Sequence, residues 1–321
     1  MRLCTFELVT AEALDSSDLA IRSRVNGVLK QDSRTRFMVF KIPRLISEIS
    51  AGCELRLGDV IITGTPPGVG FARTPPEYLR PGDAVEVEIE GSACCATRCR
   101  EELAMLEAFT WYKQSAFRWK GEKLVVYIDP WGLVGDLPPA DLILITHAHG
   151  DHYEKSDIAK VKASKTAFVA PADVAKELSG KVTAVKPGDR VDVAGVKIEA
   201  VPAYNVDPAR LQAHPKANNW VGYLMQLGGR TYYHAGDTDR LPELEKIRTD
   251  VAFVPIGDGG FVMTVDEAAG LVKAMKPKLA VPMHYGFYPG VGVASDGEKF
   301  KRAAAGIDVT VMKPLNEFAN K

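Results

Sequence analysis

Four side chains that can bind metal ions lie in one short segment of the chain: His147, His149, Asp151 and His152. His147 and His149 are two residues apart, so in extended backbone their side chains point the same way and can bind one ion. Asp151 and His152 begin the following turn, where they can face a second ion. Imidazole nitrogens together with a carboxylate suit zinc, and also manganese or ferrous iron. The segment therefore predicts a site for two divalent metal ions, with zinc favoured.

The apolar run that precedes this segment has to position it. Residues 142–145 are Leu-Ile-Leu-Ile, a short and continuous run that ends where the polar residues begin. Such a run is typical of a buried strand. We therefore expect the histidines on the loop that leaves the end of this strand.

Length and composition narrow the class of protein. The chain has 321 residues, 46% of them hydrophobic and 25% charged, which is long enough for two globular domains. The net charge of −1 gives no electrostatic reason to expect binding to nucleic acid or to a membrane. No apolar run approaches the length of about 20 residues that spans a bilayer. Acidic residues such as Glu7 and Glu12 interrupt the N-terminal stretch, which therefore lacks the apolar core of a secretion signal. We expect a cytoplasmic protein that acts on a small molecule.

Strands and helices alternate through most of the chain after residue 108. Expected strands form hairpins at 108–112 with 115–119 and at 191–193 with 196–201. Further strands are expected at 125–128, 166–170, 222–227, 231–234, 251–254 and 279–283, and helices at 155–162, 172–178 and 265–275, the first with Ser156 as its N-cap.

The segment 146–152 resembles the signature of the metallo-β-lactamase superfamily. Three other stretches carry the same resemblance, at 125–131, 232–239 and 279–286, and it covers roughly residues 108–321. It implies an α/β fold, the αββα sandwich in which two sheets are covered by helices, and the alternation of elements fits that architecture. It also implies that Asp129 supports the metal loop, that Asp237 bridges the two metals and that His284 is the last histidine ligand.

The third ligand of the first metal is ambiguous. The family takes this ligand from the loop after the strand that ends at Val201, and here Asn205 stands where a histidine often does. His214 follows nine residues later, on a loop long enough to fold back. Because an amide oxygen is a poorer zinc ligand than imidazole, we favour His214, with Asn205 as a substrate or supporting contact. Asn205 as the ligand remains the alternative. His234 lies three residues before Asp237 on a strand, which indicates support of the site rather than ligation.

Residues 1–99 predict a different, β-rich module. We expect strands at 37–40, 60–62 and 85–90, and a helix at 43–49 with proline in its first turn. Residues 25–31, 57–70 and 79–83 resemble the C-terminal portion of the fumarylacetoacetate hydrolase fold. That family binds its metal through acidic residues upstream of this portion, which this chain lacks. Gln31 and Thr65 match substrate-contacting positions of that family, yet without the metal they have no reaction to assist.

We therefore predict two domains, a fumarylacetoacetate hydrolase-like fragment at 1–104 and a metallohydrolase domain at 105–321. The helix-favouring stretch 100–107 is the expected connection. We expect the fragment to be catalytically silent and to serve packing or the formation of a homo-oligomer.

The expected activity is metal-dependent hydrolysis. Hydroxide formed at the two metals would attack an ester, a lactone, an amide or β-lactam, or a phosphodiester, while Asp151 accepts or passes the proton. Fold resemblance does not rank these substrates. The alternatives are a carbon–carbon hydrolase or decarboxylase of the fumarylacetoacetate type and a non-catalytic binding protein.

Overall fold

A computed structural model describes residues 15–56, 59–80, 82–91, 95–98, 105–257, 260–288 and 290–319. The chain divides into two units, Met1–Ala104 and Met105–Lys321. Most of the connection expected at 100–107 lies outside the described residues. Within the described part of the chain, no helix is long and apolar enough to cross a membrane.

The N-terminal unit contains one four-stranded antiparallel sheet with the order β2-β1-β3-β4. Its strands are β1 (Ala20–Val25), β2 (Val28–Arg34), β3 (Ala84–Ile89) and β4 (Cys95–Arg98), and its helical segments are α1 (Ile42–Gly52), η1 (Thr35–Phe37) and η2 (Gly70–Ala72). The helix expected at 43–49 and the strand expected at 85–90 are confirmed as α1 and β3. The proline does occupy the first turn of α1.

The strands expected at 37–40 and 60–62 are wrong. The first stretch contains the end of η1 followed by irregular backbone, and the second is irregular throughout. Val39 is 88% exposed and Ile62 is 90% exposed, so neither run packs against the sheet. Branched residues favour a strand chiefly through packing on a pleated surface, and without that packing the propensity decides little.

The described residues of the N-terminal unit bury very few side chains. Only Ala20 and Thr35 are buried among them. The large exposed apolar side chains of this unit include Val28, Leu29, Phe37, Val39, Phe40, Ile46, Val60, Ile62, Phe71, Tyr78 and Leu79. This unit therefore lacks a hydrophobic core of its own within the described residues.

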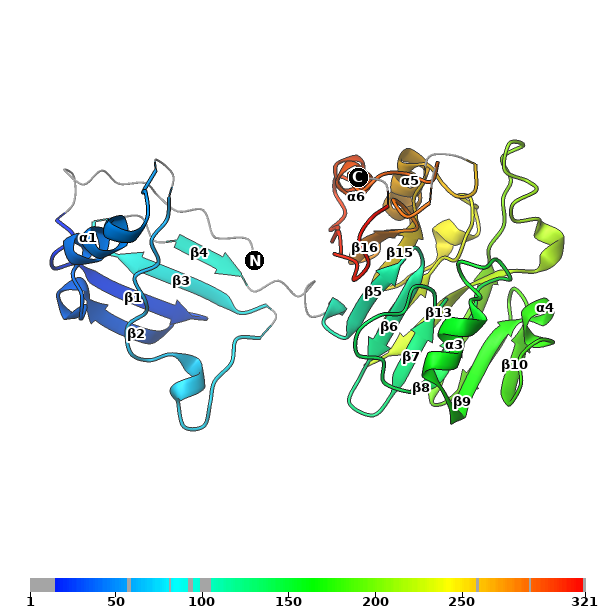
Figure 1. The fold of residues 1–321 in the computed structure, drawn as a ribbon, viewed down its shortest axis with the longest axis horizontal. Coiled ribbons are helices and arrows are strands. Elements are labelled where there is room, and N and C mark those ends of the chain that lie inside the picture. Colours follow the sequence, from blue (N-terminus) through cyan, green and yellow to red (C-terminus); the bar gives the residue numbers. More distant parts are fainter. Residues whose placement is uncertain are drawn as a thin grey trace. The chain divides into compact units, whose positions relative to one another are not determined.

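The second unit consists of two six-stranded sheets (Figure 1). The first has the order β10-β9-β8-β7-β6-β5, and the second β11-β12-β13-β14-β15-β16. The first comprises β5 (Phe109–Lys113), β6 (Ala116–Lys120), β7 (Val125–Ile128), β8 (Ala140–Leu144), β9 (Lys162–Pro171) and β10 (Lys181–Val185). The second comprises β11 (Arg190–Val193), β12 (Val196–Pro202), β13 (Val221–Leu227), β14 (Arg230–His234), β15 (Val251–Pro255) and β16 (Leu279–Met283). These strands confirm the expected hairpins and strands.

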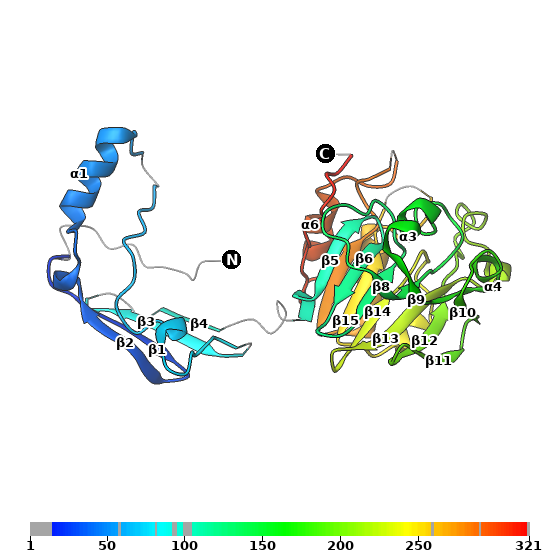
Figure 2. The ribbon, with the colours of Figure 1, turned by 60° about the horizontal axis from the view of Figure 1, so that its bottom comes forward.

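Helices cover the outer faces of both sheets, as Figure 2 shows for α3 and α4 beside β8, β9 and β10. The helices are α3 (Lys155–Val161), α4 (Ala172–Ala175), α5 (Val265–Met275) and α6 (Asp296–Ala303), and two single turns are η3 (Lys216–Asn218) and η4 (Leu244–Lys246). Helix α5 contacts β15 and α6, and α6 contacts β16. The αββα sandwich is thereby confirmed.

Successive side chains of β8 point to opposite faces of the sheet, and both faces are buried. Leu142 and Leu144 belong to the core between the two sheets, while Ile143 packs with Ile158 and Val161 of α3. Because both faces of a central strand are buried, the run is continuous rather than alternating.

Two details of the helix predictions are wrong. Ser156 does not cap α3, because Glu154 is the N-cap and its carboxylate accepts a hydrogen bond from the Ser156 backbone nitrogen at 2.9 Å. Helix α4 covers only the first turn of the stretch expected at 172–178. The helix at 265–275 is confirmed as α5, which begins with a capping box formed by Thr264 and Glu267.

Parallel pairing brings the candidate ligands together. β7, β8, β9 and β10 run parallel in the first sheet, and β14, β15 and β16 run parallel in the second. The metal loop follows β8, Asp237 follows β14 and His284 follows β16. Side chains at the carboxyl ends of parallel strands meet at one edge of a sheet, which is where α/β proteins usually place their sites.

Candidate metal centre

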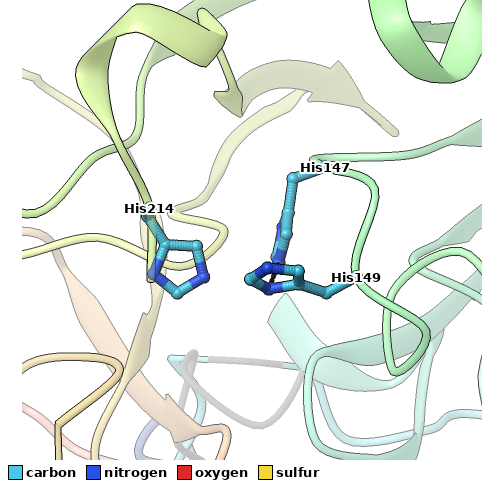
Figure 3. Close-up of side chains that lie close together, drawn as sticks. All are labelled: His147, His149 and His214. Carbon is cyan, nitrogen blue, oxygen red and sulfur yellow. Dashed lines mark hydrogen bonds between the residues drawn. The ribbon is translucent and has the colours of Figure 1, made fainter. Parts of the chain in front are cut away.

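Three histidines from two segments face one another (Figure 3). His147 and His149 come from the loop after β8, and His214 comes from the long connection between β12 and β13. One ring nitrogen from each lies within 4.8 Å of the other two. The Nε2 atom of His147 is 3.1 Å from Nδ1 of His149. We call His147, His149 and His214 the first trio.

Asp151, His152 and His284 form a second trio, whose ligand atoms also lie within 4.8 Å of one another. The Nε2 atoms of His152 and His284 are each 3.7 Å from Oδ2 of Asp151. His284 has a φ of 65°, a left-handed backbone conformation that is uncommon outside glycine. Its backbone nitrogen donates to the carbonyl of Gln114 at 3.1 Å, which helps to hold this conformation.

Asp237 lies between the two trios. Its Oδ2 atom is 2.9 Å from Nε2 of His284 and 3.3 Å from Nε2 of His214, while its Oδ1 atom is 3.4 Å from Nε2 of His152. The carboxylate is almost completely buried. Asp237 thus approaches histidines of both trios, so it could contact ions held by either trio.

Asp129 supports the metal loop from below. Its carboxylate accepts hydrogen bonds from the Thr146 backbone nitrogen at 2.7 Å, from the Thr146 hydroxyl at 2.6 Å and from Nδ1 of His152 at 2.7 Å. The bond from Nδ1 fixes the ring of His152, so its Nε2 atom faces the second trio. This is the usual way in which a carboxylate orients a histidine ligand.

The loop that carries His214 is closed by Asn205. The Asn205 backbone nitrogen donates to the His214 carbonyl at 2.9 Å, which folds the loop back on itself. The Asn205 side-chain oxygen is 2.8 Å from Nδ1 of His214. With the proton on Nδ1, the lone pair of Nε2 points at the other two histidines. This geometry favours His214 as the ligand and Asn205 as its support.

Asn205 is hydrogen-bonded to a network of charged side chains that the sequence did not reveal. Asp239 accepts a hydrogen bond from the Asn205 side-chain nitrogen at 2.9 Å and pairs with Nε of Arg210 at 3.0 Å. Arg210 in turn binds Glu267 at the start of α5, at 2.8 Å. The signal available in the sequence was the second aspartate of the stretch Gly236-Asp237-Thr238-Asp239.

His234 belongs to neither trio and supports the backbone near the site. Its Nε2 atom donates to the Ser115 carbonyl at 2.9 Å, and its Nδ1 atom is 3.3 Å from the backbone nitrogen of Gly236. Burial lowers its pKa, which keeps the ring neutral. His234 therefore holds the turn between β5 and β6 and the backbone next to Asp237.

Electrostatics divide the histidines into two kinds. Burial lowers the pKa of His147 well below its ordinary value, and the neighbouring His152 lowers it further. Burial also lowers the pKa of His149. Both rings are therefore neutral and have a lone pair to offer a metal ion.

His152 and His284 behave in the opposite way. Although burial opposes it, the carboxylates of Asp237, Asp151 and Asp129 hold the pKa of His152 well above its ordinary value. Asp237 and Asp151 likewise raise the pKa of His284 to about 9 against the effect of burial. Burial also raises the pKa of Asp151, but His152 and His284 outweigh it and hold that pKa below its ordinary value.

Several buried atoms of the cluster make no hydrogen bond, among them Nε2 of His152, Nε2 of His214 and Oδ1 of Asp237. An unpaired buried polar atom costs about 1–3 kcal/mol. All three atoms point into the cluster. Each is an imidazole nitrogen or a carboxylate oxygen, and both kinds of atom are common zinc ligands. The residues therefore fit divalent metal ions.

A cavity of about 400 Å³ opens onto the cluster. It is lined by Gln114, His149, Gly150, Asp151, His214, Asp237, Phe261, His284, Tyr288 and Val291. The sequence did not single out Gln114, Phe261, Tyr288 or Val291. A second hollow, of about 790 Å³, lies in the N-terminal unit far from these ligands in sequence. Two of its charged lining residues, Lys30 and Glu77, pair with each other at 2.6 Å.

Comparison with known proteins gives the family. The model of the beta-lactamase superfamily domain matches residues 108–284. The chain belongs to the beta-lactamase superfamily. Residues 4–100 match the C-terminal domain of fumarylacetoacetate hydrolase. Both resemblances seen in the sequence are confirmed.

Relatives within the superfamily match nearly two thirds of this chain and almost all of their own length. A UPF0173 metal-dependent hydrolase of Pyrococcus abyssi is 36% identical over 223 residues, which is 63% of this chain and 95% of the relative. One from Thermoplasma acidophilum is 33% identical over 221 residues, 64% of this chain and 93% of the relative. A metallo hydrolase structure from Ignicoccus hospitalis has a TM-score of 0.54 at 25% identity and covers 64% of this chain and 94% of that one. This superfamily member is a metal-dependent hydrolase, so the non-catalytic alternative is wrong.

Proposed function

We propose that the protein is a dinuclear zinc hydrolase. The observation that carries this proposal is the position of Asp237 between the two trios. His147, His149 and His214 would hold one ion and Asp151, His152 and His284 the other. Manganese or ferrous iron suits the same donor set.

Two metal ions in this site supply hydroxide at neutral pH and accept negative charge from the substrate oxygen. Asp151 lines the cavity and is only half-buried, so its carboxylate can accept the proton of the attacking water. In an ester or lactone, the water oxygen bonds to the carbonyl carbon and the bond from that carbon to the alcohol oxygen breaks. The proton passes from Asp151 to the alcohol. In an amide or β-lactam, the bond from the carbonyl carbon to nitrogen would break and the proton would pass to that nitrogen. In a phosphodiester, the water oxygen would bond to phosphorus, a phosphorus–oxygen bond would break and the proton would pass to the leaving oxygen.

Zinc titration is the experiment that tests this proposal. We expect about two ions per polypeptide. His152 and His284 are protonated before metal binds, so binding must displace their protons; affinity should rise with pH, by about tenfold per unit for each proton displaced. Competition with a chelator at pH 6, 7 and 8 measures this, alongside elemental analysis. Binding of no metal after reconstitution with zinc or manganese would contradict the proposal.

We further propose that the N-terminal unit takes no part in hydrolysis. Gln31, one of its two candidate substrate contacts, donates from its side-chain nitrogen to the Thr65 hydroxyl at 3.0 Å and to the Pro66 carbonyl at 2.7 Å. Gln31 and Thr65 therefore satisfy each other. The apolar side chains that this unit exposes suit packing against a second copy of the chain.

Removal of residues 1–104 is expected to leave hydrolysis within about threefold of the full chain, because the candidate ligands lie on a unit with its own core. The measurement is kcat/KM at saturating zinc, together with the molecular mass in solution. The shortened protein should form smaller assemblies than the full chain. Loss of turnover in a truncated protein that is folded and holds zinc would show that the N-terminal unit contributes to the site.

A further inference from the structure

The turn between β5 and β6 places a buried amide in the cavity of the metal centre. Gln114 is fully buried and lines that cavity. Its side-chain nitrogen is 3.4 Å from Nε2 of His284, and its side-chain oxygen makes no hydrogen bond. Buried side-chain amides are normally satisfied. This amide therefore has unused hydrogen-bonding capacity directed at the ligand cluster.

The backbone holds Gln114 in this position against its own preference. Its φ is 45°, in the left-handed region, where the short turns of hairpins usually contain glycine, asparagine or aspartate. Its carbonyl accepts hydrogen bonds from the His284 backbone nitrogen at 3.1 Å and from the Trp111 ring nitrogen at 2.8 Å. The next carbonyl, that of Ser115, accepts from His234 at 2.9 Å. Uncommon backbone conformations that the surroundings enforce in this way concentrate at functional sites.

The cavity around Gln114 suits an uncharged substrate. Among the residues that the structure describes, its lining includes no lysine or arginine, and its apolar walls are formed by Phe261, Tyr288 and Val291. Lys113 is next to Gln114 in the chain, but its Nζ atom lies 3.7 Å from the centre of the Trp131 ring, and it does not line the cavity. Sites for phosphate esters usually present arginine or lysine to the anion. The residues here favour a neutral group with an apolar substituent.

His284 does not satisfy the amide of Gln114. Nε2 of His284 lies 2.9 Å from Oδ2 of Asp237, so its hydrogen faces that carboxylate and it offers no lone pair to the Gln114 side-chain nitrogen 3.4 Å away. A metal ion bound to Nε2 of His284 would occupy the same position, so the N–H groups of the amide would still be free to serve a substrate. A preorganised donor beside the reacting group is the arrangement that stabilises charge on an attacked carbonyl oxygen.

We propose that Gln114 donates a hydrogen bond to the carbonyl oxygen of an uncharged ester or lactone substrate whose apolar part packs against Phe261 and Tyr288. This inference rests on the proposed hydrolytic function and adds a substrate class and a residue to it. Gln114 is then a catalytic residue in contact with the substrate and not a metal ligand.

The test compares two variants with a matched control in the zinc-loaded full chain. Gln114→Leu removes the amide, and Gln114→Glu keeps its size but replaces the donor with a carboxylate. Ser115→Ala is the control, because it removes a buried hydroxyl without a hydrogen bond from the same turn, outside the cavity lining. The substrates are p-nitrophenyl butyrate, γ-nonanoic lactone and bis(p-nitrophenyl) phosphate. Zinc content and melting temperature are measured for every variant.

We expect the wild type to prefer the ester and the lactone to the phosphodiester. Both Gln114 variants should lose about 100- to 1000-fold in kcat/KM, the effect of removing one such donor, with zinc content and melting temperature close to those of the wild type. Ser115→Ala should stay within about twofold. Unchanged kinetics in a folded Gln114 variant, or a loss that follows loss of zinc, would overturn the assignment. A zinc-loaded wild type that cleaves only the phosphodiester would overturn the substrate class, and one that cleaves none of the three would overturn the proposed function itself.

Discussion

Replacement of Asp237 by asparagine is expected to remove most of the bound zinc and to lower kcat by at least about 10³-fold, because water without a metal ion does not ionise at neutral pH. Asp237 is the carboxylate that approaches both trios, at 3.3 Å from Nε2 of His214 in the first and 2.9 Å from Nε2 of His284 in the second. Asparagine keeps the shape but removes the charge, and its NH2 group cannot bind a metal. The measurement combines elemental analysis with turnover at fixed free zinc.

The control for this prediction is Asp192→Asn, the same change at an exposed position on β11. It should retain full zinc content and turnover. Normal zinc content and turnover in Asp237→Asn would show that the two trios do not share a ligand.

His214 and Asn205 should differ in how severely their replacement weakens the first metal site. His214→Ala removes an imidazole from the first trio, so zinc affinity and turnover should fall together, by more than about 100-fold. Asn205→Ala removes the acceptor that orients this ring at 2.8 Å, a loss that typically costs about 10- to 100-fold. Both variants are compared with the wild type at matched free zinc, with Asn218→Ala, an exposed change in the same loop, as the control. A larger loss in Asn205→Ala than in His214→Ala would make Asn205 the ligand.

The sequence predicted the parts of the site that depend on local pattern. The run 142–145 and the donors after it are close in the chain, and a strand end fixes their directions, so their cluster needed little tertiary information. Asp237 and His284 could be named because the stretches around them resemble those of the metallo-β-lactamase superfamily, and not from local pattern alone. The strand at 251–254 was predictable as a continuous apolar run because both of its faces are buried.

What the sequence left open depends on contacts between distant residues. Whether His214 or Asn205 faces the cluster is decided by how the connection after β12 closes, and no local pattern encodes that closure. Gln114 escaped notice because glutamine in a hairpin turn carries no motif. The one available sign was the absence of glycine, asparagine or aspartate from that turn.

The errors in the N-terminal unit have a related cause. The branched runs at 37–40 and 60–62 have the composition of strands, yet their side chains are largely exposed. Branched residues favour a strand where their side chains can pack on a sheet. In the described structure these two runs have no such packing. Where the surface exists, as for the strand at 85–90, the alternation predicted the element correctly.

The proposed ligands come from two different sheets, so metal ions bound to them would link the two sheets. Four of these side chains follow β8 of the first sheet, whereas His214, Asp237 and His284 follow strands of the second sheet; the four are His147, His149, Asp151 and His152. With metal bound there, separating the sheets would require breaking metal–ligand bonds, so bound metal would slow unfolding as well as favour the folded state by mass action. Metal supply would then set how long each molecule persists, in addition to how fast it works.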